Sequence, residues 1–359
     1  MVSRRASASL FDSDDDADES HDRGSPARPG IEAPEFDDEL RRLGRALPPA
    51  VYLGTSSWSF PGWRSIVYRD EYREGQLARG GLAAYSRHPV LRAAGIDRSF
   101  YKPLTRDEYA AYARQVPPRF RFVVKAPALV ADAVLHGERG APTRDNPQFL
   151  DAQAATELFV EPALRGLRHA DGKSLAGPLV FQLSPLPAPL LRGDAGPAFI
   201  GRLGEFLARL PRDVDGTTPL YAVELRNAEL LTPRLVRTLR DTGVRLCVGI
   251  HARMPQAARQ SAALRAMDGA AEEGDAWKLK GPLVVRWSLH AGFKYDEAKD
   301  KYAPFDRLVD ADLVTRGTLT HLAHVAMKSG QAAYIIVNNK AEGCAPLSCI
   351  ELARAILAR

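Results

Sequence analysis

The stretch YAVELRN, residues 221–227, decides the fold of this sequence. It begins with the aromatic and aliphatic residues that suit a buried strand, and it ends in Glu224, Arg226 and Asn227. Burying an unpaired charge costs on the order of several kcal/mol. A strand that ends in charges therefore needs a place where those charges meet partners or water.

Short apolar stretches recur along the chain, and longer amphipathic stretches separate them. The predicted strands are residues 51–58, 94–101, 119–126, 178–185, 220–227, 245–250, 282–289 and 332–339, and the clearest predicted helices are residues 105–116, 146–167, 197–210, 232–243 and 347–359. Thr105, Asn146 and Thr232 are the residue types that cap helix N-termini, and Pro147 and Pro233 follow two of them. About eight alternations of strand and helix predict an α/β fold of parallel strands, a single (β/α)8 TIM-barrel-like domain.

The N-terminal part differs in composition from the rest of the chain. Residues 1–40 hold twelve acidic and four basic side chains, whereas the remainder holds 45 basic and 32 acidic ones. We therefore expect a disordered acidic extension over residues 1–48 and the barrel domain over residues 49–359. Three cysteines without a CxxC pair, and no apolar segment of signal or membrane length, favour a cytoplasmic protein without a membrane partner.

Alternation along the strands predicts which side chains face the barrel axis. Tyr221, Val223 and Leu225 share the face under the helices, while Glu224 and Arg226 share the inner face. The same alternation places inward, at the strand C-terminal ends, Lys125, Gln182, Arg286, His290 and one of Asn338 and Asn339. Because TIM-barrel sites are built at these ends, the sequence predicts one polar, cationic site there.

Six motifs resemble those of the YecE-like family, a domain of unknown function numbered seventy-two. They are GTSSWSFPGW (54–63), FVVKA (122–126), FQLSP (181–185), AVELRN (222–227), HAGFKY (290–295) and IIVNNKAEGCAP (335–346). The resemblance spans roughly residues 51–358 and implies a TIM-barrel-like fold with a polar pocket at the strand ends, but no settled activity. The chain departs from the family pattern at Asp97 and Ser99, where a Glu and an Asn are usual, and in lacking a Thr-His after the third strand. These departures imply a different ligand or a lost activity if the two positions touch a ligand.

Three kinds of chemistry fit the inward residues to different degrees. Glycoside hydrolysis needs two carboxylates, for which Glu224 and Asp97 are the obvious pair, but Arg226 beside Glu224 favours an ion pair instead. A metal site from Glu224, His251, His290 and Asp97 has no supporting spacing, and no nucleotide-phosphate motif follows a strand, so we expect no metal and no cofactor. Lys125, Arg226 and Arg286 favour an anionic ligand, with a simple Arg286–Glu224 ion pair as the alternative.

We therefore expect an anionic, phosphorylated or carboxylated small-molecule ligand. If the protein is an enzyme, a hydrolase or isomerase is expected, with Glu224 and His290 as the catalytic residues. The predicted ligand-binding residues are Lys125, Gln182, Arg226, Arg286, Tyr295, Asn338, Asn339, Trp58 and Asp97. The alternative is a non-catalytic binding protein for nucleic acid or another macromolecular anion, and the oligomeric state stays open. Two long connections, residues 127–149 and 291–312, are predicted as lids.

Overall fold

Eight parallel strands close into a barrel within the part of the chain that the structure describes. The structure is a computed structural model and describes residues 30–136, 142–270, 276–290 and 293–358. The barrel strands are β1 (Val51–Thr55), β2 (Leu91–Ile96), β3 (Arg121–Lys125), β6 (Ala176–Gln182), β7 (Tyr221–Glu224), β8 (Arg245–Ile250), β9 (Leu283–Trp287) and β10 (Ala333–Val337). Each strand pairs with the next one along the chain, and β10 closes the ring onto β1. The predicted TIM-barrel-like fold is confirmed.

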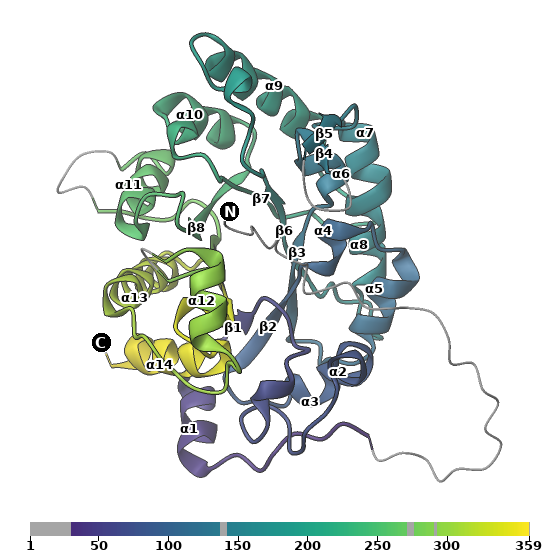
Figure 1. The fold of residues 1–359 in the computed structure, drawn as a ribbon, viewed down its shortest axis with the longest axis vertical. Helices are drawn as coiled ribbons and strands as arrows, with labels where there is room; N and C mark the ends of the chain where they lie inside the picture. The colour runs from purple at the N-terminus through teal and green to yellow at the C-terminus, as the bar shows by residue number, and fades with distance from the viewer. Residues whose placement is uncertain (1–29, 137–141, 271–275, 291–292, 359) are drawn as a thin grey trace, which may run out of the picture.

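Helices surround the strands (Figure 1). They are α1 (Asp38–Ala46), α2 (Glu74–Gly80), α3 (Leu82–Tyr85), α4 (Arg98–Tyr101), α5 (Arg106–Ala113), α6 (Ala128–Ala131), α7 (Ala152–Ala155), α8 (Glu161–Gly166), α9 (Ala195–Arg209), α10 (Pro233–Asp241), α11 (Ala257–Met267), α12 (Tyr295–Tyr302), α13 (Leu313–Lys328) and α14 (Ala345–Leu357). A π-helical segment, Thr156–Val160, joins α7 to α8. None of the helices among the described residues has the length and apolar content needed to cross a bilayer.

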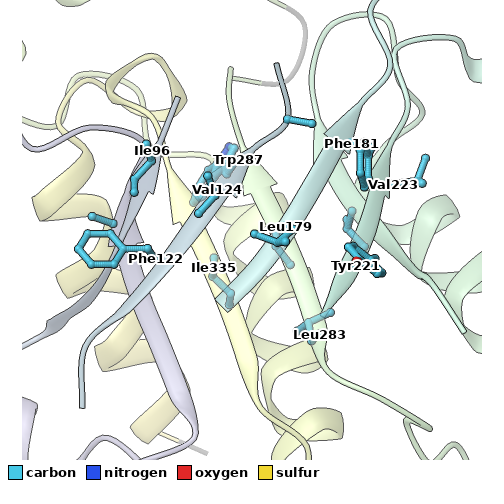
Figure 2. Close-up of a cluster of buried hydrophobic side chains, with 14 of the residues drawn as sticks. Ile96, Phe122, Val124, Leu179, Phe181, Tyr221, Val223, Leu283, Trp287 and Ile335 are labelled. Carbon is cyan, nitrogen blue, oxygen red and sulfur yellow. The ribbon is translucent and has the colours of Figure 1, made fainter. Parts of the chain in front are cut away.

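The alternation of side chains separates two hydrophobic layers. The larger layer lies between the strands and the helices, and Figure 2 shows part of it, including Tyr221, Val223 and Trp287. The smaller layer fills the barrel interior with Ala93, Val123, Val180, Ala222, Cys247, Val284, Tyr334 and Ile336. Residues two positions beyond several of these, such as Lys125, Gln182 and Glu224, therefore lie one layer higher, at the C-terminal end of the barrel.

Two sequence predictions about element boundaries are wrong. The second strand ends at Ile96, and the residues from Arg98 onward form the helical turn α4 instead of continuing the strand to residue 101. Asn146 caps no helix, because its amide donates to the carbonyls of Leu129 and Asp132, and Asp151 caps α7 instead. Thr105 and Thr232 do cap their helices as predicted.

The N-terminal extension is shorter than predicted. Residues 1–29 lie outside the described part, but residues 30–48 are folded, so the prediction of disorder through residue 48 is wrong there. The Asp37 side chain caps α1, and Glu39 of that helix pairs with Arg354 of α14 at 2.7 Å. The guanidinium of Arg92 binds the carbonyls of Gly44, Leu47 and Pro48, which fastens α1 to the barrel.

The two predicted long loops contain regular structure. The first includes α6 and the two-stranded antiparallel sheet β4 (Val134–His136) and β5 (Pro142–Asp145), which lies beside α6 and α7 (Figure 1). The second includes α12, whose Ala298 and Tyr302 are buried with Leu289 and Phe305 in a separate apolar cluster. A role of either segment as a lid stays a prediction.

Candidate functional site

Six polar side chains meet at the C-terminal end of the barrel, and we call them the mouth cluster. They are Asp97, Lys125, Gln182, Glu224, Arg226 and Arg286, contributed by β3, β6, β7, β9 and the segments after β2 and β7. Strand alternation predicted that five of them face this point, and Asp97 was predicted only as a ligand-binding residue. Four of them, Gln182, Glu224, Arg226 and Arg286, are buried.

Glu224 is the centre of the mouth cluster, with no exposed surface. Arg286 Nη1 donates to Glu224 Oε2 at 2.8 Å and lies 3.1 Å from Gln182 Oε1. Arg226 Nη2 lies 2.7 Å from Glu224 Oε1, off the direction of a hydrogen bond, and donates to Gln182 Oε1 at 2.9 Å. The Glu224 carboxylate therefore lies between two guanidinium groups, and Gln182 Oε1 accepts a hydrogen bond from each of them.

Asp97 supplies the second carboxylate of the mouth cluster. Arg286 Nη2 lies 2.8 Å from Asp97 Oδ1 and 2.6 Å from Oδ2, while Arg286 Nη1 binds Glu224. The Asp97 side chain keeps 29% of its surface exposed, so it marks the edge that faces solvent. One arginine thus connects the buried carboxylate to the accessible one, as a planar guanidinium with several donors is able to do.

These contacts argue against Glu224 as the proton carrier of a reaction. Burial by itself raises the pKa of Glu224, but Arg226, Arg286 and Lys125 together hold it below its usual value. Its carboxylate is therefore charged near neutral pH and is a weak base, since a general base works best with a pKa near the operating pH. The geometry fits the structural or positioning ion pair that the sequence favoured over a catalytic acid.

Lys125 stands apart from the rest of the mouth cluster. Its Nζ makes no hydrogen bond and no ion pair with any described residue, and it lies 3.5 Å from the centroid of the Phe100 ring. The side chain is only partly buried. Burial, together with the charges of Arg286 and Arg226, lowers the pKa of Lys125 to about 8, although Asp97 and Glu224 act in the opposite direction.

Three further residues shape this end of the barrel, and only His251 among them was considered from the sequence, as a metal ligand. Gly249 of β8 leaves room for Glu224, because a Cβ there would lie 3.1 Å from Glu224 Cγ. His251 follows β8, and burial together with Arg226 lowers its pKa to about 4, so it is neutral at pH 7. Phe100 lies on α4, a turn that the sequence suggested was strand, which is why its contact with Lys125 was missed.

Asn338 and Asn339 follow the end of β10, and Trp58 follows the end of β1. The Asn338 amide donates to Ser56 Oγ at 2.8 Å, and its oxygen accepts from Lys340 N at 3.0 Å. Asn339 is buried and accepts from Trp63 Nε1 and from the Ala345 backbone at the start of α14, which are structural contacts. Trp58 is also buried and packs edge to face on Tyr112 at 4.9 Å.

The last two predicted residues are His290 and Tyr295. His290 donates its backbone N–H to the Lys340 carbonyl, and its ring packs edge to face on Phe293 at 5.0 Å. Tyr295 begins α12, but its side chain lies outside the described part of the structure. Joint proton transfer by His290 and Glu224 stays a prediction.

Neither of two surface cavities in the described part includes the mouth cluster. A cavity of about 840 Å³ lies between the α7–α8 segment and α9, and one of about 300 Å³ is lined by Arg106, Arg165, Arg168 and Asp215. We place the candidate site at the barrel mouth because buried charges converge there, whereas both cavities are open surface depressions. Among described residues, no three His, Cys, Asp or Glu side chains are arranged to hold a metal ion.

The sequence and the fold were compared with known proteins. No curated protein matches the sequence. Two solved structures of DUF72 family proteins share the fold at 15% identity. The protein from Enterococcus faecalis V583 has a TM-score of 0.52, covering 86% of this chain and 95% of that one, and the protein from Thermotoga maritima MSB8 has 0.50, covering 86% and 99%. The family described as "Protein of unknown function DUF72" matches residues 52–359, so the chain belongs to the DUF72 family.

Proposed function

We propose that the mouth cluster binds a small molecule through its carboxylate or phosphate group. The observation that carries this proposal is the charge balance of the cluster. Its three cations, Lys125, Arg226 and Arg286, face two carboxylates, Asp97 and Glu224. With Lys125 protonated, one positive charge stays uncompensated at a partly desolvated site, which a bound anion would balance.

The two arginines and Lys125 have different parts in this proposal. Both terminal nitrogens of Arg286 contact Asp97, Glu224 or Gln182, and Arg226 Nη1 is buried without a hydrogen-bond partner among described residues. Both guanidinium groups therefore act mainly through their charge. Lys125 is partly exposed and has no carboxylate partner in the described part of the chain, so it makes the direct contact with the ligand.

Calorimetric titration with inorganic phosphate and with oxalate tests the proposal. We expect saturable binding to the wild type and a loss of about tenfold or more, about 1.4 kcal/mol, in Lys125→Met. Lys102→Met is the matched control, because Lys102 is exposed next to α4 and should leave the affinity unchanged. Binding that is absent in the wild type, or equal in the two variants, would contradict the proposal.

A single-stranded oligonucleotide in the same titration distinguishes the alternative class of ligand. If the oligonucleotide binds in a Lys125-dependent way and the small anions do not, the site serves a macromolecular anion instead. The proposed location is the cytoplasm, which fits the free thiols of Cys247, Cys344 and Cys349. For a hydrolase or isomerase activity we propose His290 as the main proton carrier, because two guanidinium groups hold Glu224 in its charged form.

A further inference from the structure

In the mouth cluster the two arginines, and not Lys125, form the ion pairs with the two carboxylates that the described residues show. Arg286 binds Asp97 and Glu224 at the same time, and Arg226 binds Glu224 from the other side. A guanidinium offers five donors in a planar fork, whereas an ammonium is a compact point charge, so the arginines occupy the carboxylate oxygens. The amine of Lys125 is left against the face of Phe100, within the field of two guanidinium groups.

Such surroundings favour the neutral amine of a lysine. The charged groups that act on Lys125 are Asp97 and Glu224, which favour its protonated form, and Arg286 and Arg226, which disfavour it. Desolvation also disfavours the protonated form, and it has the largest effect on the pKa of Lys125. A lysine that is desolvated beside other cations is a better nucleophile near neutral pH than an ordinary lysine, because a larger fraction of its amine is unprotonated there.

We propose that Lys125 forms a reversible imine with an aldehyde or ketone that carries a carboxylate or phosphate group. The amine nitrogen bonds to the carbonyl carbon while the C=O π electrons move to oxygen, which receives a proton that the nitrogen releases. The resulting hydroxyl then leaves as water with the second N–H hydrogen, and a C=N bond forms. No oxidant or reductant is needed. This inference rests on the proposed function, because the arginine charges attract the anionic group of the carbonyl compound.

Trapping with sodium cyanoborohydride tests the inference on the full chain. Glyoxylate is the probe, since it combines a carboxylate with an aldehyde, and the reagent reduces an imine to a stable secondary amine. We expect mass spectrometry of the digested protein to locate the adduct at Lys125. Lys125→Met should lose this adduct, and the exposed control Lys102→Met should keep it.

Two further measurements separate a built site from general lysine reactivity. The trapping rate at Lys125 should rise as the pH increases past about 8. The trapping rate at exposed lysines should rise only near their usual pKa of about 10.4. Glyoxylate should label Lys125 roughly tenfold faster than uncharged ethyl glyoxylate at low salt, because the cationic field concentrates the anion. Equal rates for the two probes would overturn the recruitment of the anion by the cluster.

The outcomes distinguish failure of the imine from failure of anion binding. If phosphate and oxalate bind and the adducts are spread evenly over exposed lysines, the imine inference is overturned and the proposed function stands. If neither anion binds and Lys125 is not labelled, both are overturned. Lys125→Arg separates the two roles in one variant, since it keeps the charge for anion binding but has no amine that forms the imine.

Discussion

Replacing Glu224 by Gln removes the buried carboxylate that Arg226 and Arg286 share. The substitution keeps the size of the side chain and takes away its charge, which leaves Arg226 buried without an ionic partner at 2.7 Å. Arg286 loses its 2.8 Å contact with Glu224 Oε2 but keeps Asp97. Removing one partner of a buried ion pair costs about 3–5 kcal/mol, and because the amide still offers one acceptor oxygen we expect about 3 kcal/mol.

Urea unfolding, followed by circular dichroism, measures this loss. With an unfolding slope of about 3 kcal/mol per molar urea, the midpoint of Glu224→Gln should fall by about 1 M. Asp241→Asn is the control, because Asp241 pairs with Arg240 where both side chains are more than half exposed. Such surface pairs contribute little, so its midpoint should hardly move. A Glu224→Gln midpoint that matches the control would refute the account of Glu224 as the centre of the mouth cluster.

Four other predictions follow from single contacts. Gly249→Ala should destabilise the protein by about 1–3 kcal/mol in the same assay, because the new methyl group would press on Glu224, whereas Gly201→Ala in α9 has open space and should be neutral or stabilising. The stability difference between wild type and Glu224→Gln should shrink as pH falls through the folded pKa of Glu224. A carboxyl group whose pKa is lowered by folding stabilises the protein fully above its unfolded pKa, and this stabilisation is lost as pH falls through its folded pKa. A chain that begins at residue 49 should melt at a lower temperature than one that begins at residue 30, because the first loses the carbonyl partners of Arg92. The three thiols should react with a thiol reagent only after denaturation, since all are buried and burial raises the pKa of each.

The inward-facing residues of the mouth cluster could be predicted because strand alternation is a local property. Once β7 is recognised as a strand, the period of two fixes Glu224 and Arg226 on the side opposite Val223, and the barrel topology brings the other strand ends to the same place. The same alternation places Trp287 on the outer face of the strand, and the structure buries it there under the helices (Figure 2). Local periodicity and a repeating topology were sufficient for this part.

The segment after β2 could not be predicted in the same way. Residues 94–101 contain apolar and aromatic side chains at a spacing that also fits a strand, so periodicity alone did not reveal the turn of helix at Arg98. The turn brings Phe100 against Lys125 and lets Ser99 Oγ bind the Lys125 carbonyl at 2.6 Å. Similarly, α1 was missed because the average composition of residues 1–40 is strongly acidic. Asp37 nevertheless caps a helix that begins at Asp38.

The sequence suggested that Glu224 pairs with Arg226 or with Arg286, but not that both arginines are occupied at once, and this changes how the cluster works. Three cations at strand ends look equivalent in a sequence, which suggested that all three hold the ligand. In the structure the two arginines bind Asp97, Glu224 and Gln182. These contacts fix the positions of the two positive charges. The single lysine of the cluster has no ion-pair partner among the described residues and lies against the Phe100 ring. Under the proposed function, the position of this lysine on β3, rather than the number of cations, therefore decides where the ligand binds.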